Sequence, residues 1–118
     1  MLFRSNLTVT CDDPIVARSV QRAHDDLATL RIFDPTHVDR VVVAAGAPWY
    51  MTLFGRDALL TAWMALPLGP ELALGVLDAL ADLQGTRTDP LTEEQPGRIL
   101  HEVRYDRATM RTLGGRHA

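Results

Sequence analysis

PELALGVLDALADLQG, residues 70–85, is the clearest helical signal in the chain. Its leading proline suits the first turn of a helix, where a missing N–H group is tolerated, and its final glycine stands where helices often stop. Between them the apolar residues return every three or four positions, which is the spacing of one helix face. The sequence therefore predicts an amphipathic helix whose buried face consists of Leu72, Val76, Leu77, Leu80 and Leu83.

Two more helices are predicted upstream. The first is capped by Asp12 or Asp13, with a proline in its first turn, and ends before Pro35. The second covers about residues 57–66, is expected to bury Leu59, Leu60, Trp63 and Met64, and stops at the next proline. Apolar residues recur along the first helix in steps of three and four and predict one continuous buried stripe: Val16, Val20, Ala23, Leu27 and Leu30.

Together these elements predict an all-α chain. Leu and Ala are frequent and β-branched residues are few, as is typical of helical proteins. Residues 38–43 and 98–104 have patterns that allow short extended segments between or after the helices. The Leu-rich third helix and Trp63 present more apolar surface than two short helices cover. We therefore expect exposed apolar helix faces through which the chain self-associates.

Composition and charge argue against several classes of protein. The formal net charge is −3, and the 12 basic residues, all of them arginine, are spread over several elements, so neither nucleic acid nor a membrane is expected as a partner. No apolar run reaches the ~20 residues of a membrane helix, and no signal peptide is evident. A single cysteine, Cys11, leaves the cytoplasm as the expected location. No phosphate loop, paired cysteines or zinc-type histidine spacing is present, so we expect no cofactor and no metal.

Residues 48–57, PWYMTLFGRD, are the densest candidate for a binding site. Aromatic rings pack against the apolar face of a pyranose, and an Arg–Asp pair can hydrogen-bond its hydroxyl groups. Gly55 would let the backbone approach a ligand closely. A structural role is the alternative: Asp57 caps the second helix, Arg56 pairs with an acid, and the aromatic rings belong to the core.

A second cluster, residues 93–104, reads EEQPGRILHEVR and combines three carboxylates with one histidine. Such groups can serve acid–base catalysis. Glu93 and Glu94 also fit a solvated loop. Alternation along an extended segment places His101 and Glu102 on opposite faces, so these two side chains need not share a site.

Two long segments resemble successive motifs of bacterial glycogen-debranching, amylo-α-1,6-glucosidase-like proteins: GAPWYMTLFGRDALLTAWM (46–64) and QGTRTDPLTEEQPGRILHEVR (84–104). These proteins group with the mannosylglycerate-hydrolase-like and glucoamylase-like enzymes, six-hairpin glycosidases with an (α/α)6 toroid. The resemblance covers about residues 16–104. It implies that residues 1–118 are the N-terminal part of such a catalytic domain, an incomplete toroid with about three of twelve helices and a truncated tail at 105–118.

The resemblance also implies an activity: inverting hydrolysis of α-glucosidic linkages, including the α-1,6 branches of glycogen, by two carboxylates ~6.5–9.5 Å apart. In glucoamylase-like relatives an Arg-Asp pair binds the sugar in subsite −1, which gives that role to Arg56 and Asp57. The family's acid and base lie beyond residue 118, so no catalytic residue is expected in this chain, whose partner is an α-glucan or oligosaccharide. The remaining candidate substrate-binding residues are Trp49, Phe54, His101 and Glu102.

A function of another class fits the same three helices. A free-standing small helical module would bind a sugar or a partner protein without catalysing any reaction. Hydrolysis needs two suitably spaced carboxylates, whereas binding needs only a complementary surface. Homologous sequence immediately downstream of the coding region would favour the enzyme fragment, whereas a clean stop followed by unrelated sequence would favour the module.

Overall fold

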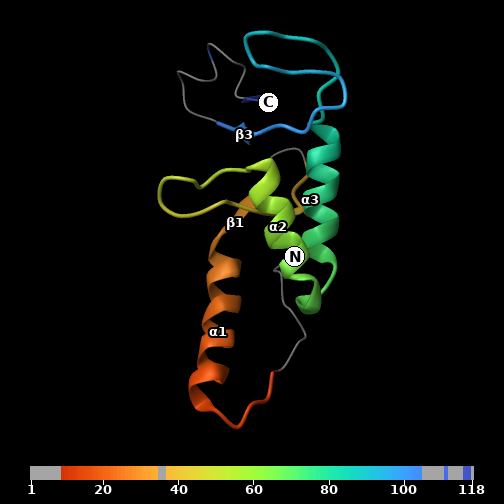
Figure 1. The fold of residues 1–118 in the computed structure, drawn as a ribbon. Helices are drawn as coiled ribbons and strands as arrows, with labels where there is room; N and C mark the ends of the chain where they lie inside the picture. The colour runs from red at the N-terminus through yellow and green to blue at the C-terminus, as the bar shows by residue number, and fades with distance from the viewer. Residues whose placement is uncertain (1–8, 35–36, 105–110, 112–115, 118) are drawn as a thin grey trace.

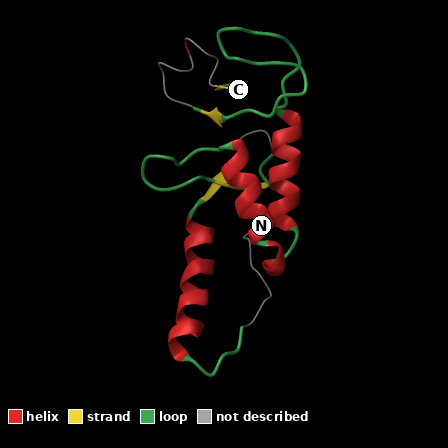
Figure 2. Cartoon of the chain, viewed as in Figure 1, coloured by secondary structure: helices red, strands yellow, loops and turns green. Residues whose placement is uncertain are grey.

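The computed structural model describes residues 9–34, 37–104, 111 and 116–117, and it combines helices with short antiparallel strands (Figures 1 and 2). Its α-helices are α1 (Pro14–Thr29), α2 (Gly55–Met64) and α3 (Glu71–Asp82), and a 3-10 helix, η1, covers Leu66–Leu68. Strand β1 (Arg31–Phe33) pairs with β2 (Val41–Val43), and β3 (Glu102–Val103) pairs with β4 (Arg116–His117). Most of the expected tail at 105–118 lies outside the described residues.

The prediction of an all-α fold, an incomplete (α/α)6 toroid, is wrong, because the chain is a mixed α/β protein. Three consecutive valines form β2, where β-branched side chains favour extended backbone. Strand β1 pairs with them in antiparallel register, with Ile32 opposite Val42. The extended segment expected within residues 38–43 is therefore present, but it belongs to a sheet that packs against α3.

Helix α1 begins as predicted but is not buried as predicted. The Asp13 side chain caps it by accepting a hydrogen bond from the N–H of Ile15 at 2.7 Å. No residue of α1 is buried, and the helix extends away from α2 and α3 (Figure 1). Only Leu27 and Leu30, at and just beyond its end, pack against the core. The apolar stripe toward the N-terminal end of α1 is exposed.

The core lies between α2, α3 and β2. Helix α3 approaches β2 closely at Gly75, where a methyl group would lie 2.0 Å from the carbonyl oxygen of Val41. Small residues on α2 also allow close packing in the core, since Ala58 and Ala62 are both buried. The apolar residues that form this core are Val42, Val43, Leu53, Ala58, Ala62, Ala65, Leu72, Val76, Ala79, Leu80, Leu100 and Val103.

The outer faces of α2 and α3 carry large apolar side chains in contact with solvent. Trp63 is 69% exposed, and Leu60 and Met64 lie beside it at helical spacing on α2. On α3, Leu77 is exposed, whereas Leu80 is buried. The exposed apolar helix faces expected from the sequence are thus present, and they include Leu60 and Met64, which the second predicted helix was expected to bury.

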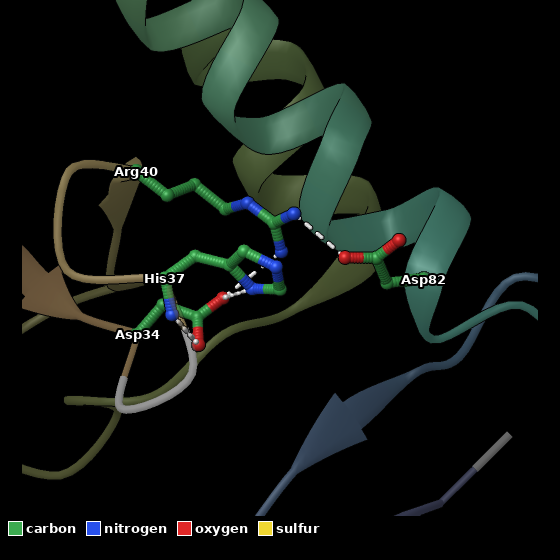
Figure 3. A network of polar contacts seen from close by, with 4 residues as sticks. All are labelled: Asp34, His37, Arg40 and Asp82. Atoms are coloured by element: carbon green, nitrogen blue, oxygen red, sulfur yellow. Dashed lines mark hydrogen bonds and ion pairs between the residues drawn. The ribbon is translucent and has the colours of Figure 1, made fainter.

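A polar network holds the β1–β2 connection against the end of α3 (Figure 3). The Arg40 guanidinium is 11% exposed and donates to Asp82 at 2.6 Å and to Asp34 at 2.9 Å. The hydrogen bond with Asp82 is the main reason why the pKa of Arg40 lies above its ordinary value. His37, whose side chain is half exposed, has its Nδ1 3.7 Å from the Asp34 carboxylate. We assign this network a structural role, because it joins a strand connection to a helix.

Candidate functional site

The two sequence motifs meet through backbone pairing. The N–H of Gly55 donates to the carbonyl of His101 at 3.0 Å, and the N–H of Val103 donates to the carbonyl of Leu53 at 3.0 Å. The Thr52 hydroxyl also donates to the Val103 carbonyl. Residues 52–55, which lead into α2, therefore run antiparallel to residues 101–103. Segments almost fifty residues apart in sequence are joined at the start of this helix.

The junction is tight because it has a glycine on one side and buried leucine and valine on the other. A methyl group at Gly55 would lie 2.3 Å from the carbonyl oxygen of Leu100 and 3.1 Å from the Ile99 side chain. Leu53, Leu100 and Val103 are all buried in the core. The backbone around His101 is thereby fixed relative to the first turn of α2.

Aromatic side chains cover one side of this junction. The Phe54 ring packs edge-to-face against His101, with ring centroids 5.5 Å apart, and against Tyr50, with centroids 5.9 Å apart. Trp49 belongs to a hairpin loop closed by hydrogen bonds between Gly46 and Tyr50, and it is 81% exposed. The aromatic residues of the first motif are therefore not a buried core cluster.

Arg56 and Asp57 occupy the first turn of α2. The residue at the cap position is Phe54, which makes no side-chain capping bond, so the interpretation of Asp57 as the helix cap is wrong. The Asp57 carboxylate lies 3.3 Å from Arg56 Nε, and the Arg56 side chain is 82% exposed. Such an exposed pair contributes at most about 1 kcal/mol to stability. Because the fold depends little on this pair, both side chains can also contact a ligand.

Beside this pair lies an open hollow of about 500 Å³. One wall comes from α2 and the other from the segment that follows the loop after α3. The hollow is lined by Arg56, Leu59, Leu60, Arg98, Ile99, Leu100 and His101. It thus contains Arg56 and His101 from the predicted set, while Asp57, Trp49, Phe54 and Glu102 lie outside its lining.

Arg98 is the polar residue of this hollow that the sequence patterns did not indicate as a site residue. Its Nη1 donates to the carbonyl of Glu93 at 2.8 Å, and its Nη2 lies 3.8 Å from the Glu93 carboxylate. Glu93 adopts a φ of 60°, which residues other than glycine rarely adopt. The signal available in the sequence was the Gly97-Arg98 pair within the second motif, but its proximity to α2 depends on long-range pairing.

The loop before Arg98 is held by its own hydrogen bonds. The N–H of Gly85 donates to the Arg98 carbonyl and the N–H of Gly97 donates to the Gly85 carbonyl, both at 2.8 Å. The Thr86 N–H donates to the Glu94 carboxylate at 2.9 Å, and this bond lowers the pKa of Glu94. Glu94 is therefore a structural residue of the loop.

The remaining acidic candidate, Glu102, does not line the hollow. Its carboxylate lies 2.8 Å from Arg104 Nε and is largely shielded from solvent. His101, the preceding residue, lines the hollow and is exposed. The alternation predicted for this segment therefore separates the two side chains, as expected for an extended backbone.

Among the residues that the structure describes, the lining of the hollow carries two guanidinium groups and one imidazole but no carboxylate. Within the described part of the chain, no group of three or more His, Cys, Asp or Glu side chains is arranged to hold a metal ion. None of the described helices is both long enough and apolar enough to cross a membrane. No protein-family model matches this chain, and no curated protein matches it.

Proposed function

We propose that this chain acts in carbohydrate metabolism, as a part of an inverting glycoside hydrolase that acts on α-glucosidic linkages such as the α-1,6 branches of glycogen. The observation that supports the proposal best is the convergence of the two motifs. Arg56 comes from one motif and His101 from the other, and both line the same hollow. The leucine and isoleucine side chains of this hollow offer a surface for the apolar face of a sugar ring.

In this proposal Arg56 and Asp57 bind hydroxyl groups of the sugar in subsite −1. A guanidinium only donates hydrogen bonds and a carboxylate only accepts them, so the pair serves both kinds of hydroxyl partner. Arg56 projects from α2 into solvent at the edge of the hollow, and Asp57 lies directly beside it. His101 contributes a further polar contact from the opposite wall.

The proposed role is substrate binding, without the chemical step. Inverting hydrolysis needs a general acid and a general base ~6.5–9.5 Å apart, and none of the described lining residues is a carboxylate. The chain by itself is therefore expected to release no glucose from isomaltose or limit dextrin above the buffer rate. We place the protein in the cytoplasm, in keeping with its single cysteine.

The absence of a carboxylate from the lining also favours a second candidate function. A small sugar-binding module without catalysis would need the same donor groups and apolar walls and nothing more. The two functions make the same prediction for binding and differ only when the chain is assayed with the acid and base supplied by another part of the enzyme.

The test is the variant Asp57→Asn, titrated with millimolar isomaltose or maltotriose by two-dimensional NMR. Because Asp57 is not the helix cap, its removal should alter stability by less than about 1 kcal/mol, through the helix dipole. Loss of a charged hydrogen bond to the sugar should weaken binding about tenfold or more. Arg18→Gln on α1, far from the hollow, is the matched control. Unchanged sugar affinity in a folded Asp57→Asn protein would refute the assignment.

A further inference from the structure

The polar groups that line the hollow are almost all hydrogen-bond donors. Arg56 and Arg98 are guanidinium groups, which only donate, and His101 adds an imidazole. A neutral sugar presents hydroxyl groups that must both donate and accept. A carboxylate, in contrast, only accepts hydrogen bonds at neutral pH, and a phosphate monoester is mainly an acceptor. A lining dominated by donors is therefore matched best by an acceptor-rich anion.

We propose that the hollow binds a sugar that carries an oxyanion, a phosphate or a carboxylate, with Arg98 as the principal anion-binding residue. This inference rests on the sugar-binding role proposed above and goes beyond it, because it adds anionic sugars to the neutral α-glucans considered there. The sugar ring lies on Leu59, Leu60 and Ile99, and its anionic group lies between the two guanidinium groups. Binding pockets for small molecules commonly have volumes of ~300–1,000 Å³, and the hollow, at about 500 Å³, falls within this range.

Arg98 is held in place before any ligand arrives. Its backbone N–H donates to the Gln95 carbonyl at 3.0 Å, its carbonyl accepts from Gly85, and its Nη1 donates to the Glu93 carbonyl. The side chain is 40% exposed, half as much as that of Arg56. A guanidinium that is already ordered loses little conformational entropy when it binds an anion, and this raises affinity.

The carboxylates nearby do not occupy the space of the ligand. Asp57 contacts the Nε of Arg56, and the Glu93 carboxylate lies 3.8 Å from one Nη of Arg98. Glu102 is engaged by Arg104. All three lie outside the described lining. Asp57 and Glu93 each engage part of one guanidinium group, so an anion in the hollow would bind the N–H groups that these contacts leave available.

The full chain should be titrated with glucose 1-phosphate, glucuronate, methyl α-glucoside and inorganic phosphate, and followed by two-dimensional NMR including the arginine Nε–H signals. We expect at least one anionic sugar to bind about tenfold more tightly than methyl α-glucoside and to shift the Arg98 signal. Comparison of glucose 1-phosphate with glucuronate distinguishes phosphate from carboxylate as the preferred group.

Two variants and one control locate the effect. Arg98→Gln should abolish the preference for anionic sugars. If its altered loop prevents folding, Arg56→Gln replaces it, because that side chain is largely in solvent and its loss should weaken anion binding about tenfold. Arg87→Gln is the control, since Arg87 lies in the same loop and pairs with Glu94 and Asp89 outside the hollow. The control should keep the wild-type preference.

The outcomes separate this inference from the proposed function. Methyl α-glucoside binding as tightly as both anionic sugars would overturn the inference and leave the sugar-binding function standing. An anion preference that survives in folded Arg98→Gln and Arg56→Gln would also overturn it. Inorganic phosphate that binds without any sugar binding would contradict the proposed function as well. Loss of the preference in Arg98→Gln but not in Arg87→Gln would establish the assignment.

Discussion

Replacing Gly55 with alanine should destabilise the fold and disturb the hollow at the same time. The new methyl group would lie 2.3 Å from the Leu100 carbonyl oxygen, whereas ordinary contacts begin at 3.4 Å. The obstacle is backbone, which cannot rotate away as a flexible side chain would. The segment that carries His101 must therefore move by about 1 Å, and the 3.0 Å hydrogen bond from Gly55 to the His101 carbonyl is strained or lost.

The size of the effect follows from three contributions. Overpacking of a well-filled site costs about 1–3 kcal/mol. A lost backbone hydrogen bond adds about 0.5–1.5 kcal/mol. Alanine is the better helix former by at most about 1 kcal/mol, and less at the first position of a helix. The net loss should be about 2 kcal/mol, which lowers the Tm of a domain of this size by roughly 10 °C.

Circular dichroism melting curves of the wild type, Gly55→Ala and Gly46→Ala provide the assay. Gly46 is the matched control, because a methyl group there meets nothing within 4 Å and its backbone lies outside the left-handed region. Its replacement should leave the Tm unchanged or raise it slightly, through a less flexible unfolded chain. A Gly55→Ala protein as stable as the wild type would refute the close packing of the two motifs.

Three other predictions concern parts of the molecule outside the hollow. Arg40→Met should lower the free energy of unfolding by about 2–3 kcal/mol, because it removes the donor that two carboxylates share. Asp82→Asn changes the exposed partner and should lower it by under about 1 kcal/mol. Chemical denaturation measures both values. The pKa of Glu94 is lowered on folding, so the ionised carboxylate stabilises the fold above its ordinary pKa of 4.5, and this stabilisation is lost as the pH falls through the lower folded value. Melting curves recorded below about pH 5 should show this loss of stability. The variant Glu94→Gln should lack this part of the pH dependence. The exposed apolar face of α2 should promote self-association of the chain. Trp63→Gln should reduce the association constant measured by sedimentation. A wild-type protein that stays monomeric at high concentration would contradict this prediction.

Local signals in the sequence predicted the helices well. The Asp13 cap and the proline after it mark the start of α1, and the three- and four-residue spacing of α3 predicts its buried face apart from the exposed Leu77. These features depend on neighbours within one or two helical turns. Gly85 follows the end of α3, whose C-cap is Leu83, as the sequence predicts. It also has a role that the local pattern does not show, because the backbone of Gln95 lies against it and leaves no room for a side chain.

The strands could not be predicted in the same way. Arg31–Phe33 follows an apolar stripe of helical period that runs to Leu30, so nothing local separates it from the helix. Its extended form is stabilised by pairing with Val41–Val43, and that pair packs on α3 where Gly75 allows close approach. The extended form of β1 therefore depends on contacts between segments that are distant in the sequence. The same reason explains why Arg98 was missed, since its place beside Arg56 depends on the pairing of residues 52–55 with 101–103.

The two faces of α2 explain why folding and binding can be tested separately in this chain. Buried Ala58 and Ala62 form the face that meets the core, and their small size lets α3 pack closely. Arg56 and Leu60 lie on the outward face, where side chains take no part in the packing of the core. A substitution on the outward face should therefore change ligand affinity at nearly constant stability. Gly55, at the start of the helix, takes part in both, because it packs against Leu100 and fixes the backbone of His101. Comparing the two kinds of variant distinguishes loss of a binding group from loss of the frame that positions it.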